Sequence, residues 1–262
     1  MTQHTTAQHP GPAKVALVTG AARRIGRAIA LGLARDGWDV AVHYRHSEAE
    51  ALATVAEIEA LGRRAAALRC DLAEQDQVRQ LLARAAAALG PVGCVVNSAS
   101  LFDYDSAADF GTARLDAHMH ANLAAPILLA QALHAATPAG AQAVVVNLLD
   151  QKLYNLNPDF LSYTLSKAAL HAATTLLAQA LAPTVRVVGI APGITLVSGE
   201  QSAAGFEKAH QATPLGRSST PEDVADSVCY VARARALTGT TLLVDGGQHL
   251  TPLARDVMFG AQ

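Results

Sequence analysis

The amino-acid sequence predicts an α/β protein built on a doubly wound parallel sheet of seven strands, with helices on both faces. Two patterns lead to this prediction. Short, almost wholly apolar runs recur along the chain, as expected for strands that are buried on both faces. Between them lie longer segments whose apolar residues repeat at intervals of three and four, which is typical of one face of a helix. With 262 residues, 51% of them hydrophobic, the chain can bury one substantial core.

The apolar runs place the strands in chain order. They lie at residues 14–19, 39–43, 65–69, 93–97, 143–148, 185–190 and 241–244. The first helix is predicted from the spacing of Ile25, Ile29 and Leu33, the second covers 47–61 and ends at Gly62, and the third runs through Val78 to a Gly-Pro stop at residue 90. Thr220, followed by Pro and two acids, predicts the start of the last helix.

The alternation leaves no room for an interdomain linker. Residues 13–262 are therefore expected to form one domain, with ligands bound at the carboxyl ends of the strands where the strand order reverses. Residues 1–12 are polar, end in Pro and Gly and lack the apolar run of a signal peptide, which predicts a disordered tail. Residues 195–217 are rich in small and polar residues; a mobile lid and an ordinary surface loop are both compatible with them.

Charge and composition exclude several classes of function. The net charge of −2 and the scattered basic residues argue against nucleic-acid binding. No stretch approaches the roughly 18 apolar residues of a membrane span, so the prediction is a cytoplasmic protein. Cys70, Cys94 and Cys229 lie in or beside apolar segments and are interpreted as reduced core residues. His118 and His120 would point to different sides of a helix, so no metal site is predicted.

A glycine-containing turn follows the first predicted strand. Gly20 would allow the tight turn and Gly26 would let the helix pack closely, while the helix N-terminus offers free N–H groups to a pyrophosphate. This position is typical of the Rossmann-type fold and predicts that residues 13–262 form a dinucleotide-binding catalytic domain. A plain glycine-containing turn is the alternative interpretation of the same residues.

The end of the second strand indicates which dinucleotide is bound. An NAD-dependent enzyme commonly has an acidic residue there to hold the ribose hydroxyls, but residues 43–47 read His-Tyr-Arg-His-Ser. Arg45 and Arg24 would pair with a 2′-phosphate, and His43 and Ser47 would donate hydrogen bonds to it. The sequence therefore predicts NADPH as the cofactor.

Tyr163 and Lys167 are four residues apart, which places both side chains on one face of a helix. A neighbouring ammonium favours the phenolate, so Tyr163 would act as a general acid or base nearer neutrality than its usual pKa near 10 allows. Taken alone, this spacing is common by chance and also fits a half-exposed helix face.

Together, these motifs resemble the short-chain dehydrogenase/reductase family. The resemblance runs from Lys14 to Leu250 and includes residues 97–100 (Asn-Ser-Ala-Ser), Asn122, the Pro-Gly at 192–193 and the Asp-Gly-Gly at 245–247. It implies that Lys167 also binds the nicotinamide ribose and that Asn122 anchors a water linking Lys167 to solvent. It also implies a homotetramer.

Within the family, the chain most resembles the pteridine reductases, including the dihydromonapterin reductases. The resemblance rests on residues 19–26, residues 43–47, and Asp150, which lies thirteen residues before Tyr163. Most short-chain reductases have Ser near this position to hold a carbonyl, and a carboxylate would repel developing alkoxide charge. It suits reduction of a C=N bond, because an Asp-Tyr-Lys relay could then deliver a proton to the ring nitrogen.

The resemblance implies further contacts. Phe102 would stack on the pterin, with an ordinary core aromatic as the alternative, and Ser100 would contact both pterin and cofactor. Asp71 and Leu72 would border the adenine, and Thr195 would approach the pyrophosphate. The full set of expected cofactor contacts is Gly20, Arg24, Ile25, Gly26, His43, Tyr44, Arg45, His46, Ser47, Asp71, Leu72, Asn97, Ser98, Ala99, Ser100, Tyr163, Lys167, Pro192, Gly193 and Thr195.

The predicted activity is NADPH-dependent reduction of a dihydropteridine, or of dihydrofolate, to the tetrahydro form. Catalysis is assigned to Asp150, Tyr163, Lys167 and Asn122, and substrate binding to Ser100, Phe102, Asp150 and Tyr163. Two alternatives stay open at this point: a carbonyl or 3-oxoacyl thioester reductase that tolerates Asp150, and a non-catalytic NADP-binding regulator.

Overall fold

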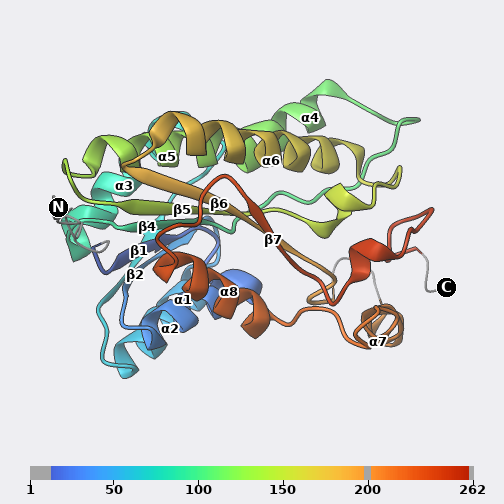
Figure 1. The fold of residues 1–262 in the computed structure, drawn as a ribbon, viewed down its shortest axis with the longest axis horizontal. Helices are drawn as coiled ribbons and strands as arrows, with labels where there is room; N and C mark the ends of the chain where they lie inside the picture. Colours follow the sequence, from blue (N-terminus) through green and yellow to red (C-terminus); the bar gives the residue numbers. More distant parts are fainter. Residues whose placement is uncertain (1–12, 198–201, 260–262) are drawn as a thin grey trace, which may run out of the picture.

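The computed structural model describes residues 13–197 and 202–259 (Figure 1). The tail predicted at residues 1–12 lies outside the described residues, as do four residues of the segment 195–217.

The described residues contain one sheet of seven parallel strands in the order β3-β2-β1-β4-β5-β6-β7. The strands are β1 (Val15–Val18), β2 (Asp39–Tyr44), β3 (Ala65–Arg69), β4 (Cys94–Asn97), β5 (Ala143–Leu148), β6 (Val185–Pro192) and β7 (Thr241–Val244). The predicted fold class is confirmed. Strand β6 is longer than predicted because its last two residues pair with β7, a contact that the apolar run alone does not reveal.

Helices cover both faces of the sheet (Figure 1). One face carries α1 (Arg24–Arg35), α2 (Glu48–Ala60) and α8 (Pro221–Arg233), and the other carries α3 (Gln75–Leu89), α5 (Ala125–Ala136) and α6 (Leu161–Leu181). Shorter elements are α4 (Thr112–Met119), the π-helix η1 (His120–Ala124), the 3-10 helices η2 (Gln151–Tyr154) and η3 (Gln248–Leu250), and α7 (Ala203–Gln211). Among the described helices, none is both long enough and apolar enough to cross a bilayer.

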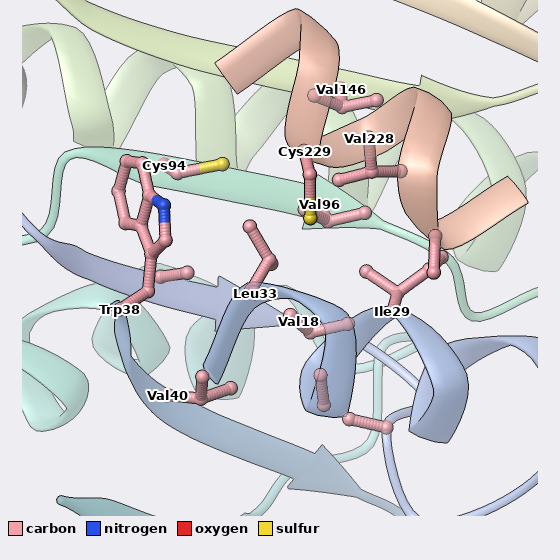
Figure 2. Packing of buried hydrophobic residues seen from close by; sticks show 14 of the residues in the cluster. Val18, Ile29, Leu33, Trp38, Val40, Cys94, Val96, Val146, Val228 and Cys229 are labelled. Carbon is pink, nitrogen blue, oxygen red and sulfur yellow. The ribbon is translucent and has the colours of Figure 1, made fainter. Parts of the chain in front are cut away.

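The core consists of two main apolar clusters, one on each side of the sheet. On the α1/α8 side, Ile29 and Leu33 of α1 and Val228 and Cys229 of α8 pack together on the valines of the central strands (Figure 2). At Gly32 the two helices come so close that a Cβ would lie 3.1 Å from the Cβ of Ala225. All three cysteines are buried and unpaired, which confirms their interpretation as small core residues.

Helices α7 and α8 begin at side-chain caps. Thr220 accepts a hydrogen bond from the Asp223 amide, and the Asp223 carboxylate accepts one from the Thr220 amide, so the predicted start of α8 is confirmed as a capping box. The segment 195–217 differs from the expectation of irregular structure because it contains α7, capped by Ser202. Only one large apolar residue, Phe206, lies in this helix, so its periodicity is weak in the sequence.

The strand order reverses between β1 and β4, which lie side by side at the centre of the sheet. Thr19 joins the loops that follow them: its hydroxyl accepts hydrogen bonds from the amides of Ser98 and Ala99, both at 3.0 Å. Loops after parallel strands open at the same edge, so the fold creates its ligand-binding edge at this point.

Candidate active site

The β1–α1 loop fits a dinucleotide. Gly20 has a φ of +66°, and a Cβ there would lie 3.0 Å from the Cα of Ala99. A Cβ at Gly26 would lie 2.2 Å from the carbonyl oxygen of Gly20, so only glycine lets α1 begin this close to β1. These contacts give the two glycines the packing role predicted for them, and a pyrophosphate held by the N–H groups at the start of α1 stays a prediction.

Arg24 occupies an unusual backbone position in this loop. Its φ of +55° lies in the left-handed region, which costs a side-chain-bearing residue about 1 kcal/mol. Its guanidinium donates a hydrogen bond to the carbonyl of Val197 at 2.9 Å and lines the same cavity as Tyr163. Arg45 is not among the residues of that cavity, and the pairing of the two arginines with a 2′-phosphate stays a prediction.

His43 has a different task from the predicted one. It is buried, its Nδ1 accepts a hydrogen bond from the Gly20 amide at 3.0 Å, and its Nε2 donates to the carbonyl of Cys70 at 3.0 Å. Burial lowers the pKa of His43 to about 4, so the ring is neutral near pH 7. The prediction that His43 donates to a 2′-phosphate is therefore wrong for this conformation, because its single N–H is already bonded; the ring instead holds the loop at Gly20.

Arg45 and Asp71 meet at the ends of β2 and β3. The Arg45 Nε and an Asp71 carboxylate oxygen are 2.9 Å apart, and more than half of the Arg45 side chain is exposed. Both were expected near the adenosine end of the cofactor, and the adjacency of the two strands explains why they lie together. Of the other residues predicted here, Tyr44 donates a hydrogen bond to Glu48, His46 is exposed, Ser47 is half-buried beside them, and Leu72 is buried in the core.

Asn97 is turned into the interior rather than towards the cavity. Its amide donates a hydrogen bond to Asn147 on β5 at 2.8 Å, and Asn147 in turn donates to Thr174 on α6 at 3.0 Å. This chain of bonds ties the end of β4 to β5 and to the helix that carries Tyr163. The side chain of Asn97 thus positions the site.

A cavity of about 230 Å³ opens at the carboxyl ends of β1, β4, β5 and β6. It brings together residues that are more than 160 positions apart in the chain. Those predicted from the sequence are Arg24, Ile25, Ser98, Ser100, Phe102, Asp150, Tyr163, Lys167, Pro192, Gly193 and Thr195.

Asp150 and Tyr163 are directly bonded in this cavity. The Tyr163 hydroxyl donates to the Asp150 Oδ2 at 2.7 Å, and the other carboxylate oxygen accepts from the Lys152 amide at 2.8 Å. Asp150 comes just after β5 and Tyr163 lies in the first turn of α6, so a strand end and a helix start create the pair. The start of α6 is itself held by the buried Asp105, which accepts a hydrogen bond from the Ser162 amide at 2.9 Å.

The pair favours its protonated forms. Burial raises the pKa of Asp150, against the lowering effect of the Lys152 amide and of the Tyr163 hydroxyl. Burial, and then the negative charge of Asp150, raise the pKa of Tyr163 well above 10. The expectation that Lys167 brings the pKa of Tyr163 towards neutrality is therefore wrong for this structure, because the nearest charge on the phenol is a carboxylate. Tyr163 is held as a neutral acid.

Lys167 lies deeper in the same cavity. Its ammonium donates a hydrogen bond to the Leu148 carbonyl at 2.7 Å and lies 5.8 Å from the centre of the Tyr163 ring. Burial lowers its pKa to about 8, while the Asp150 carboxylate acts in the opposite direction. Lys167 can therefore gain and lose a proton close to physiological pH.

Asn122 connects the elements around this group. It lies in the π-helix η1, accepts from the Leu101 amide at 2.8 Å and donates to the Ser166 hydroxyl at 3.0 Å. The loop after β4 and helix α6 are joined through one side chain. The predicted water bound by Asn122 remains a prediction.

Phe102 forms part of an aromatic cluster at the cavity wall. Its ring stacks on Phe160 with the centroids 4.3 Å apart and meets Tyr163 edge-on at 4.6 Å. With 38% of its surface exposed, Phe102 is not an ordinary core residue. One face of the ring is covered by Phe160, which fixes the ring at the cavity.

Sequence reasoning missed nearly half of the residues that line the cavity. Helix η2 contributes Gln151 and the buried Lys152, and the segment 251–259 contributes Asp256. Lys152 and Asp256 are 3.1 Å apart as an ion pair, although 104 residues separate them. Because the two charged partners lie so far apart in the chain, their ion pair produces no local pattern in the sequence. The other unpredicted lining residues are Leu148, Leu149, Ile194, Leu196, Gln248, Val257 and Met258.

The family whose description is enoyl-(acyl carrier protein) reductase matches residues 20–249. The chain belongs to this family, the short-chain dehydrogenases/reductases. It is 33% identical over 250 residues to an L-rhamnose 1-dehydrogenase (NAD(P)(+)) of Sphingomonas sp. strain SKA58. The aligned region covers 90% of this chain and 96% of that protein. It is 31% identical over 243 residues to the 3-oxoacyl-[acyl-carrier-protein] reductase FabG of Staphylococcus epidermidis, at 90% and 99% coverage.

A solved structure adds a more specific likeness. The FolM alternative dihydrofolate reductase 1 of Brucella canis, complexed with NADP, superposes with a TM-score of 0.88 at 41% identity, covering 92% of this chain and 96% of that one. The family prediction is thus confirmed, and this short-chain oxidoreductase is similar to a member of the pteridine-reductase-like group as well as to carbonyl reductases.

Proposed function

We propose that this short-chain reductase uses NADPH to reduce a dihydropteridine, or dihydrofolate, to the tetrahydro form. The observation that carries the proposal is the 2.7 Å hydrogen bond from Tyr163 to Asp150, at the position where most short-chain reductases are expected to have Ser. The likeness to FolM of Brucella canis, solved with NADP, supports both the substrate class and the cofactor.

The residues at the ligand-binding edge suit NADPH. The N–H groups at the start of α1 would hold the pyrophosphate, and Arg45 would meet the 2′-phosphate. Lys167, buried beside Tyr163, would bind the nicotinamide ribose. NADPH supplies a hydride when it is bound, and the protein must supply the accompanying proton.

The proton path runs through side chains that are already in contact. Tyr163, neutral because its pKa is raised, donates its hydroxyl proton to the ring nitrogen of the reduced C=N bond. Asp150, whose pKa is also raised by burial, lies at hydrogen-bond distance to return a proton to Tyr163. Lys167, whose own pKa is about 8, is the next proton donor of the relay. No group in this path needs to stabilise an alkoxide.

A carbonyl or 3-oxoacyl thioester reductase is the second candidate, favoured by the likeness to FabG. In that reaction negative charge develops on the carbonyl oxygen, and an ionised Asp150 would oppose it electrostatically. A protonated Asp150 would donate a hydrogen bond as a Ser hydroxyl does. The charge of Asp150 therefore does not by itself separate the two candidates, because a protonated Asp150 also serves the relay to Tyr163.

A substrate panel separates the candidates. NADPH consumption is measured with dihydrobiopterin, dihydromonapterin, dihydrofolate and a 3-oxoacyl thioester. Turnover of the dihydropteridines with little turnover of the thioester is expected; turnover of the thioester alone would overturn the proposal. Tight NADPH binding with no turnover of any substrate would instead favour a non-catalytic regulator. From the family resemblance we further propose that the protein is cytoplasmic and forms a homotetramer. Light scattering on the purified protein tests the oligomeric state.

A further inference from the structure

The segment 251–259 closes one side of the active-site cavity. After β7 the chain turns through η3, and Asp256, Val257 and Met258 then line the same cavity as Asp150 and Tyr163. Figure 1 shows this segment beyond the end of β7, at the edge of the sheet where the loops of the active site lie. The family match ends at residue 249, so this wall lies outside the part of the chain that the family describes.

Several contacts hold the segment in place. Arg255 forms paired hydrogen bonds with the buried carboxylate of Asp159, with N–O distances of 2.8 to 3.0 Å. The Asp159 carboxylate also accepts from the Asp256 amide at 2.7 Å. The ring of Phe259 lies 6.1 Å from that of Phe160. The segment is thus fixed to the loop that precedes helix α6.

Lys152 fixes the direction of the Asp256 carboxylate. The Lys152 side chain is 5% exposed and that of Asp256 is 14% exposed. The Lys152 ammonium donates to Asp256 at 3.1 Å and to the Asp159 carbonyl at 2.6 Å. Its backbone amide bonds to Asp150, so one residue orients both carboxylates of the cavity.

The wall formed by η2 and the segment 251–259 contains hydrogen-bond acceptor positions on Asp256 and Gln151 beyond those used by the contacts below. A carboxylate offers about four acceptor positions, and Asp256 uses one oxygen for Lys152 and the other for the Met258 amide. Among the described residues, the buried Oε1 of Gln151 in this wall has no hydrogen-bond partner. The negative charge of Asp256 also reaches the catalytic pair, because it raises the pKa of both Asp150 and Tyr163.

We propose that Asp256 is a specificity-determining residue: it accepts hydrogen bonds from an N–H-bearing edge of the substrate, such as the amino edge of a 2-amino-4-oxopyrimidine ring. The inference rests on the proposed function and deepens it, since a ketone or an acyl thioester presents no such edge. It also assigns a role in recognition to a segment that the family motifs do not include.

Two ligands that differ at one group test this inference. 6-Methylpterin has an amino group at position 2, and 6-methyllumazine has an oxo group there, which would face the carboxylate with a lone pair. Their dissociation constants are measured by calorimetry on the full chain saturated with NADP. Because a hydrogen bond to a charged group is strong, the wild type is expected to bind 6-methylpterin at least about tenfold more tightly. Asp256→Asn is expected to reduce that preference about tenfold.

Asp159→Asn is the matched control. It alters a buried carboxylate of the same network that does not line the cavity, so it should weaken both ligands in equal proportion and leave their ratio unchanged. If Asp256 only held the segment in place, Asp256→Asn would also weaken both ligands equally and leave the ratio of their affinities unchanged. The ratio therefore distinguishes recognition from support.

The wild-type comparison needs no variant and keeps the inference falsifiable if Asp256→Asn does not fold. Equal affinity of the wild type for the two ligands, or an unchanged ratio in a folded Asp256→Asn, would overturn it. If dihydropterins are nevertheless reduced, only the role of Asp256 is lost. If 6-methylpterin does not bind and no dihydropterin is reduced, the proposed function fails as well.

Discussion

The two ends of the ligand-binding edge are built in opposite ways. At the ends of β2 and β3, Arg45 and Asp71 lie at the surface, with 55% and 27% of their side chains exposed, and they meet because two neighbouring strands end there. At the end of β5, Asp150, Tyr163 and Lys167 are enclosed, and burial is the largest influence on the pKa of each. The first region is organised by exposed charges, the second by desolvation.

This difference determines how each region responds to change. A solvated ion pair contributes little to stability, so its residues can be selected for ligand binding alone. Buried ionisable groups lower the stability of the fold in one protonation state, and that cost shifts the pKa values of Asp150 and Lys167 towards neutrality and that of Tyr163 away from it. Substitutions at the two ends should therefore separate binding from chemistry.

The largest effect is expected at the buried end. Tyr163→Phe removes the proton donor, so kcat with the accepted substrate should fall about 10²- to 10⁴-fold. The KM for NADPH should change little, because the ring and its packing remain. Steady-state kinetics measure both constants, with the exposed Tyr230→Phe on α8 as the control. A loss of less than tenfold would show that Tyr163 is not the acid.

Lys167 connects this end to pH. Its pKa is lowered from 10.5 to about 8, so between these values the unfolded chain holds a proton that the folded chain has released. Stability should therefore rise by about 3 kcal/mol as the pH increases from 8 to 10.5. In the same range kcat should decline, since the relay loses its protonated amine.

Urea denaturation and kcat profiles over this pH range check the expectation. Lys167→Met should flatten the rise in stability and strongly reduce kcat, whereas the exposed Lys208→Met should do neither. A wild-type stability that is independent of pH between 8 and 10.5 would contradict the buried, depressed amine.

His43 is a buried group at the exposed end and sharpens the comparison. Its pKa is lowered from 6.5 to about 4, so the unfolded chain binds a proton between these values and the folded chain does not. Stability should fall by about 3 kcal/mol as the pH drops from 6.5 to 4. His43→Gln should remove most of this fall, with the exposed His134→Gln as its control. An acid response that is identical in wild type and His43→Gln would contradict the neutral, doubly bonded ring.

The smallest effect is expected at Arg45. Arg45→Ala should raise the KM for NADPH about tenfold, the equivalent of one strong contact, and leave kcat and the KM for NADH nearly unchanged. Thermal stability should also stay the same, since the Arg45–Asp71 pair is exposed. Arg27→Ala breaks a comparably exposed ion pair on α1 and provides the control. Equal changes in the KM for NADPH and NADH would contradict a contact between Arg45 and the 2′-phosphate.

Local patterns were sufficient for the fold, and together with the family resemblance they were sufficient for the centre of the site. Apolar runs located every strand of the sheet, because strands buried on both faces have a continuous apolar signature. The spacing of Tyr163 and Lys167 placed them on one helical face, and the resemblance to the pteridine reductases identified Asp150, thirteen residues before Tyr163. Each of these relations lies within about twenty residues.

What the sequence did not reveal depends on partners far along the chain. The role of His43 follows from its bonds to Gly20 and Cys70, which only the strand pairing brings within reach. The raised pKa of Tyr163 follows from burial, whereas the Tyr-Lys spacing predicts a lowering. Lys152 and Asp256 are matched across 104 residues, and neither looks functional by itself.

The central claim is that Asp150 selects the chemistry. The most direct test compares wild type with Asp150→Ser, using the preferred dihydropteridine and a 3-oxoacyl thioester as substrates with NADPH. We predict that the variant loses at least about a hundredfold in kcat/KM for the dihydropteridine, because its proton relay is broken, and gains or keeps activity on the thioester. Undiminished reduction of the dihydropteridine by Asp150→Ser would contradict the account.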